Sequence, residues 1–302
     1  MLQPFKAGSK LLGKMSANKI VVLGSNGRVG RELMEQISLN RKYKVFGFNK
    51  SNLNIIDHKK VSNILESIRP NTIINCAAYT NVDLAESNKK KCFAINVAAS
   101  LNLHEISLRF NSHLINLSTA SVFNSNKKEL INLNQSRKPV NYYNYTKLKA
   151  EEISEEFAVK GLKVLNLRPY WIYSKSRKDF NGFVIDSIEK KILMKIVANQ
   201  FGQPTSADLI SKLIIESMKM NLTGFLPATS GGIANRVNWA RKIVSLIGKG
   251  ENLICEISDQ EFPSSAKRPF NASLENIQWN DYNVRIPDWQ EDLEIFFGNH
   301  VF

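Results

Sequence analysis

Cysteine and histidine are scarce in this sequence, and their spacing excludes several kinds of site. The 302 residues include 3 cysteines and 4 histidines. Cys76, Cys92 and Cys255 are odd in number and widely separated, so they offer neither a disulfide framework nor a metal-ligand spacing. No two histidines stand four residues apart. The sequence therefore predicts no metal site, and its cysteine usage is typical of the reducing cytoplasm.

Long apolar runs are also absent. No stretch of about 18 or more apolar residues occurs, so we expect no membrane-spanning helix. Residues 1–18 contain lysines but no continuous apolar segment, which is unlike a secretory signal. We expect these residues to form a disordered N-terminal tail, with Met15 as an alternative start of the chain, and we expect the protein to be cytoplasmic.

Positive charge is in excess, but it is dispersed. The formal net charge is +14. The lysines are scattered and are not gathered with aromatic residues into one stripe, and the densest run, 89–91, is typical of a solvated helix start. We therefore expect no nucleic-acid partner.

A glycine turn between a strand and a helix is the most informative stretch that is present. An apolar run, 20–23, leads into Gly24, Gly27 and Gly30, and an amphipathic helical pattern follows to Leu39. Side chains in such a turn would keep a pyrophosphate from the backbone and the helix from the strand. The helix N-terminus then favours phosphate. We interpret the turn as a nucleotide site; the alternative is an α/β turn that binds nothing.

Short apolar strands alternate with amphipathic helices from residue 19 to about 170. Strands are expected at 20–23, 43–48, 72–75, 113–118 and 163–167, and helices at 61–68 and 93–110. This alternation predicts an α/β fold with a Rossmann-type, doubly wound parallel sheet. The second half is less regular, with helices expected at 206–220, 235–247 and 287–297. Thr205 and Asp208 form a capping-box pattern for the first of these.

The end of the second expected strand bears on the choice of cofactor. An acidic residue commonly stands there to bind the adenine ribose of NAD. This chain has Asn49 followed by Lys50, with Arg28 in the glycine turn. Two cations without an acid favour a 2′-phosphate, so we expect NADPH rather than NADH. The alternative is that Lys50 is an ordinary surface lysine.

A tyrosine and a lysine four residues apart follow a Ser-Thr pair at the end of a strand. Tyr143 and Lys147 share one face of an expected helix, and Tyr142 and Tyr145 are rival tyrosines. A nearby lysine cation is expected to lower the phenol pKa from about 10 and can hold the nicotinamide ribose. Thr119 would orient a substrate carbonyl, and Tyr143 would donate a proton to its oxygen as hydride reaches its carbon. An exposed helix face is the alternative.

Six segments together carry a family resemblance over residues 19–297. They are G-S-N-G-R-V-G-R-E-L, C-A-A-Y-T-N-V-D-L-A-E, Y-Y-N-Y-T-K-L-K-A-E-E, N-Q-F-G-Q-P-T, R-P-F-N-A-S-L and P-D-W-Q-E-D-L. This set resembles the extended short-chain dehydrogenases/reductases, and among them the dTDP-4-dehydrorhamnose reductases. The last three segments resemble motifs that are specific to that branch.

The resemblance implies roles for individual residues and a division of the chain. The catalytic residues would be Thr119, Tyr143 and Lys147. The cofactor would be lined by Gly24, Gly27, Arg28, Val29, Gly30, Asn49, Lys50, Asn54, Ile55, Ala77, Ala78 and Tyr79. Thr80, Ala120 and Trp171 would lie near the sugar, although Trp171 would equally suit a core. Residues 19–172 would form the dinucleotide-binding domain, rejoined by helix 206–220, and residues 173–302 would form mainly a smaller C-terminal substrate-binding lobe.

One segment departs from the family pattern. Where the family usually has S-T-D-Y-V-F, this chain has S-T-A-S-V-F, so Ala120 and Ser121 replace an acid and a tyrosine. Asn54 likewise replaces an acid on the adenine side. The hydride-transfer residues are unaffected, but the identity of the sugar stays open.

The resemblance implies an NAD(P)H-dependent reduction of the 4-keto group of a nucleotide-activated deoxysugar, in nucleotide-sugar or polysaccharide biosynthesis. A sugar-nucleotide epimerase would need the same triad. A non-catalytic regulatory subunit, similar to the β-subunit of methionine adenosyltransferase, is a further alternative. Dehydration is disfavoured because no acid stands at position 120 or 121. The expected partner is a nucleotide-sugar substrate, and a homodimer stays open.

Overall fold

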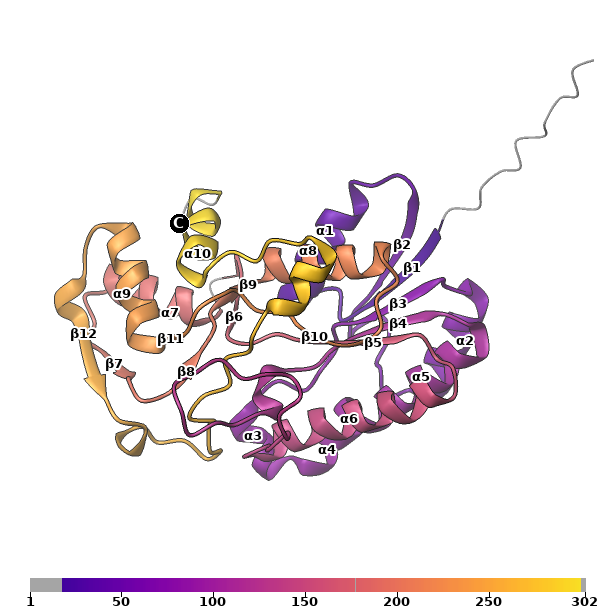
Figure 1. The fold of residues 1–302 in the computed structure, drawn as a ribbon, viewed down its shortest axis with the longest axis horizontal. Helices are drawn as coiled ribbons and strands as arrows, with labels where there is room; N and C mark the ends of the chain where they lie inside the picture. The colour runs from indigo at the N-terminus through magenta and orange to yellow at the C-terminus, as the bar shows by residue number, and fades with distance from the viewer. Residues whose placement is uncertain (1–17, 177, 300–302) are drawn as a thin grey trace, which may run out of the picture.

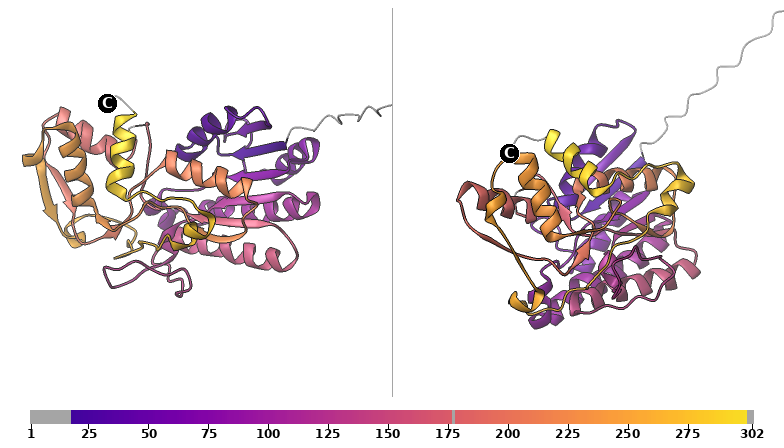
Figure 2. Two further views of the ribbon diagram at one scale, coloured as in Figure 1. Left: turned by 45° about the horizontal axis from the view of Figure 1, so that its top comes forward. Right: turned by 60° about the vertical axis from the view of Figure 1, so that its left-hand side comes forward.

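The computed structural model describes residues 18–176 and 178–299 (Figure 1). Of the predicted tail, only Asn18 lies within the described residues, and it begins the first strand. Figure 2 shows a parallel sheet covered by helices on both faces, beside a smaller group of helices and short strands. No helix in residues 18–299, as far as they are described, is long and apolar enough to cross a membrane.

A parallel sheet of 6 strands forms the centre of the molecule, in the order β2-β1-β3-β4-β5-β10. The strands are β1 (Asn18–Leu23), β2 (Tyr43–Phe48), β3 (Thr72–Asn75), β4 (His113–Leu117), β5 (Val164–Arg168) and β10 (Gly224–Pro227). The five predicted strands are confirmed to within two residues at each end. The sixth, β10, comes from the irregular second half and was not predicted. The doubly wound α/β class is therefore confirmed.

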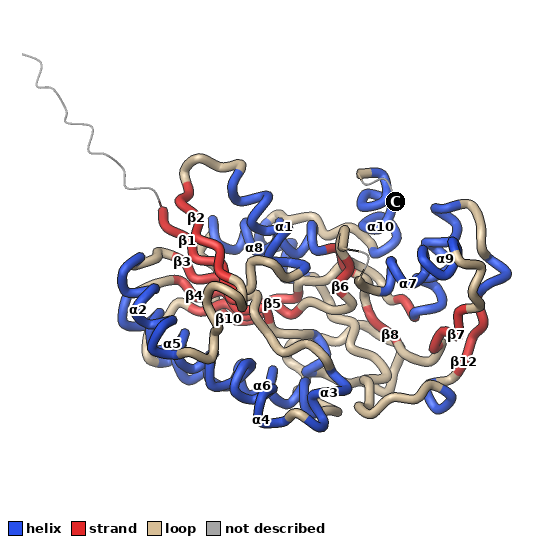
Figure 3. The backbone as a smooth tube through the Cα atoms, turned by 180° about the vertical axis from the view of Figure 1, so that it is seen from behind, coloured by secondary structure: helices blue, strands red, loops and turns tan. Residues whose placement is uncertain are grey.

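Helices cover both faces of this sheet (Figure 3). On one face lie α1 (Arg28–Ser38) and α8 (Ala207–Lys219), and on the other lie α2 (His58–Ile68), α5 (Ala99–Phe110) and α6 (Tyr142–Val159). Alternate residues of β1 point to opposite faces, so Ile20 and Val22 pack into the core with α1 and α8. Val21 and Leu23 pack into the other core. A strand buried on both faces needs the continuous apolar run that the sequence shows.

The order of the strands places a switch point between β1 and β3. The chain leaves β1 to one side for β2 and then crosses to the other side for β3. Connections that diverge in this way open a crevice at the carboxyl ends of the strands, which is where open α/β sheets bind ligands. Gly24 follows β1 and Cys76 follows β3, so the predicted glycine turn lies at this crevice.

The connections around the sheet and the second half of the chain contain shorter elements. Beside α6 lie α3 (Val82–Ser87), α4 (Lys89–Phe93), the π-helical turn η1 (Ala94–Ala98) and η2 (Ala120–Val122). The second half contains β6 (Ile172–Tyr173), α7 (Phe180–Glu189), β7 (Met194–Val197), β8 (Phe201–Gly202), β9 (Thr205–Ser206), β11 (Ala234–Asn235), α9 (Arg236–Ile247), η3 (Glu251–Leu253), β12 (Ile254–Ile257), η4 (Asp259–Glu261), η5 (Ile277–Tyr282) and α10 (Trp289–Gly298). Helices α7, α9 and α10 enclose a second core around Trp239 and Leu293. The domain boundary at residue 172 stays a prediction.

Two local predictions about helices were wrong in detail. The expected helix 93–110 is interrupted by η1, which separates α4 from α5. The expected capping box of Thr205 and Asp208 does not form. Instead, Ser206 is the N-cap and accepts a hydrogen bond from the Leu209 amide at 3.0 Å. The Thr205 hydroxyl donates to the Gln203 carbonyl and is therefore already engaged.

A buried carboxylate joins the second core to the sheet. Asp292 on α10 accepts hydrogen bonds from the Tyr173 hydroxyl at 2.8 Å and from the Ser206 amide and hydroxyl at 2.7 Å each. Burial raises the pKa of Asp292 above its usual value, against the opposing effect of these donors. The start of α8, which packs on the sheet, is thus fixed by a residue of the last helix.

We predict that Gly30→Ala destabilises the fold. A Cβ at position 30 would lie 2.2 Å from the Gly24 carbonyl oxygen, and backbone cannot yield as a flexible side chain does. We expect the free energy of unfolding in urea to fall by about 2 kcal/mol. Gly298→Ala is the matched control, because its Cβ would meet nothing within 4 Å in α10. Equal stability of the two variants would contradict the prediction.

Candidate active site

The glycine turn brings two backbone segments into close contact at the switch point. Gly24 has a φ of 75°, in the left-handed region that favours glycine. A Cβ at Gly24 would lie 2.7 Å from the Ala77 backbone nitrogen, so the turn fits against the residues after β3 only as glycine. The Gly27 amide donates to the Gly24 carbonyl at 2.9 Å and closes the turn.

Helix α1 begins directly after this turn, with Gly27 as its N-cap, and no side chain caps its first backbone amides. These are the amides of Arg28, Val29 and Gly30, which have no partner within the helix. Donors of this kind, together with the helix dipole, fit a dinucleotide pyrophosphate. The residues present therefore fit the phosphate end of a nicotinamide cofactor.

On the adenine side the structure places the predicted residues after β2, beside the glycine turn. The Asn49 side-chain oxygen accepts a hydrogen bond from the Ser51 amide at 2.8 Å, and Lys50 is exposed. Arg28 is exposed too, but its Nη2 donates to the Lys178 carbonyl at 2.7 Å. The Lys178 carbonyl thus engages part of the Arg28 guanidinium.

The remaining adenine-side residues differ in exposure. Asn54 is half-buried, whereas Ile55 is buried in the core beside Leu23. The first acid after β2 is Asp57, and its carboxylate accepts from the Lys60 amide at 3.0 Å as the N-cap of α2. Asp57 is thus engaged in capping α2, and no acidic residue stands at the end of β2, where an acid commonly binds the adenine ribose of NAD.

A buried asparagine fixes the segment that follows β3. Asn96, in the π-helical turn η1, accepts from the Tyr79 amide at 2.8 Å and donates to the Tyr79 carbonyl at 3.2 Å. It also donates to the Thr146 hydroxyl on α6 at 3.0 Å. The π-turn that interrupts the predicted helix thus presents a side chain that ties Tyr79 to the helix carrying Tyr143 and Lys147.

Thr119 and the start of α6 meet at the carboxyl end of β4. The Thr119 hydroxyl lies 2.8 Å from the Ser121 hydroxyl, which donates to the Asn144 side-chain oxygen at 2.7 Å. Asn144 directly follows Tyr143 on α6. The Tyr143 hydroxyl makes no hydrogen bond within the described residues and is available to a substrate oxygen.

Lys147 is buried, and its ammonium donates to the Leu117 carbonyl at 2.5 Å. Burial lowers the pKa of Lys147 from 10.5 to about 8, against the opposing effect of the Glu151 carboxylate. Burial also raises the pKa of Tyr143 above its usual value. The expectation that Lys147 lowers the phenol pKa is therefore not met in this structure, because burial and the Cys92 thiol both raise that pKa.

The rival tyrosines lie on other faces of α6. Tyr145 also precedes a lysine by four residues, but it is 40% exposed, and that lysine, Lys149, pairs with Glu152 at 2.7 Å. The Tyr142 ring lies beside that of Tyr145, tilted by 34°, with ring centroids 5.7 Å apart. The geometry favours Tyr143, which alone shares its face with the buried Lys147.

The three residues expected near the sugar have different surroundings. Thr80 is exposed, close to the segment after β3. Ala120 is completely buried in an apolar cluster with Val122 and Phe123, so its side chain does not lie at a substrate surface, contrary to the expectation. Trp171 is half-buried, and its φ of 41° is uncommon for a bulky residue.

The surroundings of Trp171 include a cation that sequence reasoning missed. Its ring stacks on Tyr170 at 5.4 Å and on Trp239 at 5.9 Å. The Arg236 guanidinium lies 4.6 Å from the Trp171 ring centroid and 5.2 Å from that of Phe180. Arg236 makes no ion pair within the described residues, and burial lowers its pKa. In the sequence this position was marked only as part of the expected helix 235–247.

Other buried polar residues were missed for a similar reason. Asn144 and Glu151 stand on α6 at positions where a helix usually places apolar residues toward a core. Their burial could have been inferred from the helical period, but not their partners. No group of three or more His, Cys, Asp or Glu that could hold a metal ion occurs in the part of the chain that the structure describes.

Comparison with known proteins gives a family match over nearly all of the chain. The family model described as RmlD substrate binding domain matches residues 18–301. A dTDP-4-dehydrorhamnose reductase of Aggregatibacter actinomycetemcomitans is 26% identical over 290 residues, covering 91% of this chain and 97% of that protein.

Solved structures give the same result. The crystal structure of dTDP-4-dehydrorhamnose reductase from Bacillus anthracis in complex with NADP has a TM-score of 0.87 and 28% identity, covering 94% of this chain and 99% of that one. UDP-glucose 4-epimerase of Thermus thermophilus in complex with NAD has a TM-score of 0.79 at 15% identity, covering 93% and 98%. The second likeness shows the fold alone.

The depressed pKa of Lys147 predicts a pH dependence of stability. Below pH 8 both the folded and the unfolded chain hold this proton, whereas between pH 8 and 10.5 only the unfolded chain does. Raising the pH through this window therefore favours the folded state. In the wild type, the unfolding free energy should rise by on the order of 3 kcal/mol across this window. We expect the Lys147→Met variant to lack this rise.

Urea unfolding of wild type and variant from pH 7 to 10 measures this difference. Lys149→Met is the matched control, because Lys149 is exposed on the same helix and its pKa is raised by Glu152. Its stability should follow that of the wild type. Parallel curves for wild type and Lys147→Met would contradict the assignment of the depressed pKa.

Proposed function

The chain belongs to the RmlD substrate binding domain family, and from that premise we propose that it reduces the keto group of a nucleotide-activated deoxysugar with NADPH. The reaction would serve nucleotide-sugar or polysaccharide biosynthesis. The relatives named dTDP-4-dehydrorhamnose reductase support this activity. The sugar is left at the level of its class, because Ala120 and Ser121 depart from the pattern expected beside it.

One observation carries the proposal. The glycine turn, the Thr119 hydroxyl, the Tyr143 phenol and the Lys147 ammonium all belong to segments at the carboxyl edge of one parallel sheet. The turn contacts the backbone after β3, and Lys147 donates to the last residue of β4. A phosphate-binding end and a proton donor on one crevice support a nicotinamide-dependent reaction at a carbonyl.

Each of the three side chains would have a separate role in the reaction. When bound, the nicotinamide ring supplies a hydride to the carbonyl carbon. Tyr143 would donate its proton to the carbonyl oxygen; because burial raises its pKa, the phenol is a weaker acid here and needs a cation that stabilises the phenolate. Thr119 would donate a second hydrogen bond to the same oxygen by turning its proton away from the Ser121 hydroxyl, which itself donates to Asn144. Lys147 holds the cofactor ribose and stabilises the phenolate that remains.

We propose NADPH rather than NADH. Arg28 in the glycine turn and Lys50 after β2 are exposed cations, and Asn49 stands where an acid would repel a 2′-phosphate. The Bacillus anthracis relative, whose crystal structure is a complex with NADP, supports this choice. The Arg28 bond to the Lys178 carbonyl keeps its guanidinium near α1 while leaving other donors for phosphate.

We also propose that Arg236 binds the diphosphate of the sugar nucleotide. Its guanidinium is flanked by Trp171 and Phe180 and has no carboxylate partner in the described chain. Arg268 lowers the pKa of Arg236 further, so two cations are close together while only Arg268 has a counterion, Asp83. An anionic ligand would relieve this excess charge.

Two alternatives keep the same site. An epimerase would use the same phenol but would retain its cofactor and return the hydride. The fold alone is shared with UDP-glucose 4-epimerase. A regulatory subunit would bind the cofactor without turnover. Cytoplasmic localisation, which the three unpaired cysteines support, and a homodimer stay proposals.

Net consumption of NADPH tests the function. We expect oxidation of NADPH with at least one 4-keto-6-deoxy sugar carried on dTDP, GDP, UDP or CDP. Interconversion of isomers by NMR without net NADPH loss would instead identify an epimerase. Binding of NADPH with neither reaction, over all four nucleotides, would favour the regulatory role.

Tyr143→Phe tests the proton donor. We expect turnover to fall by about 10²–10⁴-fold, because the variant keeps the ring but lacks the donated proton. NADPH affinity, measured by fluorescence titration, should change less than about threefold, since the phenol proton plays no part in phosphate binding. Tyr145→Phe is the control and should keep full turnover. Wild-type turnover in Tyr143→Phe would overturn the assignment.

Arg236→Met tests the diphosphate contact. Methionine keeps the apolar stem against Trp171 and removes the charge, so KM for the sugar nucleotide should rise about tenfold with little change in kcat. Arg241→Met on the same helix is the matched control, because Arg241 is exposed and pairs with Glu256 at 2.6 Å. An unchanged KM in Arg236→Met would remove Arg236 from the site.

A further inference from the structure

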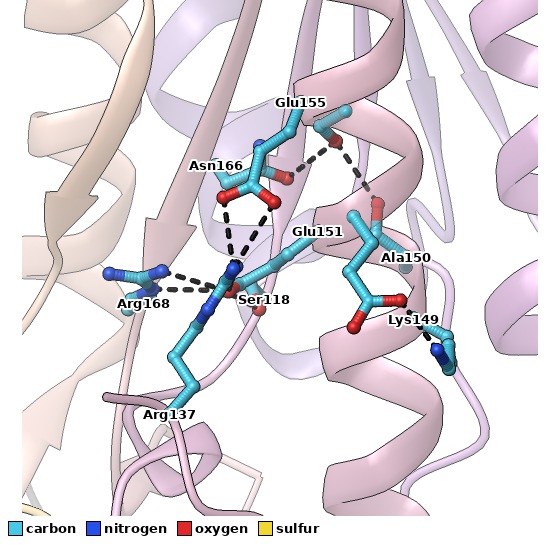
Figure 4. Close-up of polar contacts among 10 residues, drawn as sticks. Ser118, Arg137, Lys149, Ala150, Glu151, Glu155, Asn166 and Arg168 are labelled. Carbon is cyan, nitrogen blue, oxygen red and sulfur yellow. Dashed lines mark hydrogen bonds and ion pairs between the residues drawn. The ribbon is translucent and has the colours of Figure 1, made fainter.

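A second buried carboxylate lies one helical turn beyond Lys147. Glu151 on α6 is 0% exposed, and both of its oxygens are engaged (Figure 4). Ser118 donates its hydroxyl at 2.6 Å, and Arg168 on β5 donates from Nε at 2.9 Å and from Nη2 at 2.8 Å. Arg137 adds a bond from Nη1 at 3.2 Å. A carboxylate buried so completely is costly unless paired in this way.

These contacts concern three consecutive residues at the end of β4. The Leu117 carbonyl accepts from Lys147, the Ser118 hydroxyl donates to Glu151, and Thr119 follows with the hydroxyl proposed to meet the substrate. Lys147 and Glu151 stand four residues apart and share one face of α6. Two successive turns of α6 are thus fastened to the two residues that precede Thr119.

A small polar cavity lies between the lysine and the carboxylate. Its volume is about 10 Å³, close to the space that one water molecule needs. Besides Lys147 and Glu151 it is lined by Asn75, Asn116 and Asn166, which lie in register across β3, β4 and β5. The side-chain nitrogens of Asn116 and Asn166 have no partner in the described structure, which fits a water there.

The charged and titratable groups that act on Lys147 come from three neighbouring elements. Glu151 is on α6, Cys92 is on α4, and Cys76 follows β3. Burial raises the pKa of both thiols, so neither supplies a negative charge near neutral pH. Glu151 is therefore the anion that opposes the desolvation of the Lys147 ammonium.

We propose that Glu151 is a positioning residue for the reaction: it keeps Lys147 protonated and, through Ser118, sets the place of Thr119 against α6. The proposal rests on the proposed function for its catalytic consequence. The effect of Glu151 on the protonation of Lys147 can be measured through NADPH binding, without any sugar substrate.

Glu151→Gln tests the electrostatic part, because glutamine keeps the shape and removes the charge. The pH dependence of the NADPH dissociation constant is measured in a Tyr143→Phe background, so that the phenol does not titrate. We expect the alkaline loss of affinity to move about one pH unit lower. Glu155→Gln is the matched control, since Glu155 pairs with Arg137 one turn further on and is half exposed. Its profile should match that of the background.

If Glu151→Gln and Glu155→Gln give the same pH dependence of NADPH affinity, the proposal is overturned. A purely structural ion pair would not shift the pH at which affinity is lost. If Glu151→Gln does not fold, Ser118→Ala decides the positioning part. That variant keeps the Glu151 carboxylate but removes its hydrogen bond to Ser118. We therefore expect kcat to fall about tenfold, while the alkaline loss of NADPH affinity stays at the same pH. Full kcat in Ser118→Ala would then overturn the proposal.

The two proposals can fail separately. A shifted pH dependence of NADPH affinity without turnover of any keto sugar would contradict the proposed function and leave this inference standing.

Discussion

The contact between the glycine turn and the chain after β3 is the constraint on which the rest of the structure depends. Because no side chain separates Gly24 from Ala77, the first strand and the third end side by side in the sheet, and α1 begins directly above the crevice between them. The free amides at the start of α1 and the ends of β3 and β4 therefore lie at the same edge of the sheet. Helix α6, which carries the proposed proton donor, is fastened to that edge by Asn96, Lys147 and Glu151.

Burial acts in opposite directions on the two titratable groups of the site. It raises the pKa of the Tyr143 phenol and lowers the pKa of the Lys147 ammonium, so each group is pushed toward its neutral form. A phenol is protonated at neutral pH without any shift, and a raised pKa makes it a weaker proton donor. Proton donation therefore depends on a cation that stabilises the phenolate, and the Glu151 carboxylate one turn away opposes the loss of the Lys147 proton.

Features set by neighbouring residues could be predicted, and features set by distant ones could not. The glycine turn, the five early strands and the shared face of Tyr143 and Lys147 follow from spacing within a few residues. The strand β10, the π-turn at Asn96 and the arginines around Glu151 depend on segments far apart in the sequence. The direction of the Tyr143 shift and the burial of Ala120 were missed because both depend on what packs around them. Thr205 and Ser206 are adjacent hydroxyls, and the bonds of Thr205 to Gln203 and of Ser206 to Asp292 decide which of them caps α8.

The carboxylate of Asp292 has a consequence for the order in which the protein can form. It holds the start of α8, and α8 packs against α1 on one face of the sheet. Trp279, which donates to the Pro227 carbonyl at the end of β10, belongs to the same core. During synthesis the first strands leave the ribosome long before these residues. The full set of contacts on this face of the sheet is therefore complete only after residue 292 has emerged.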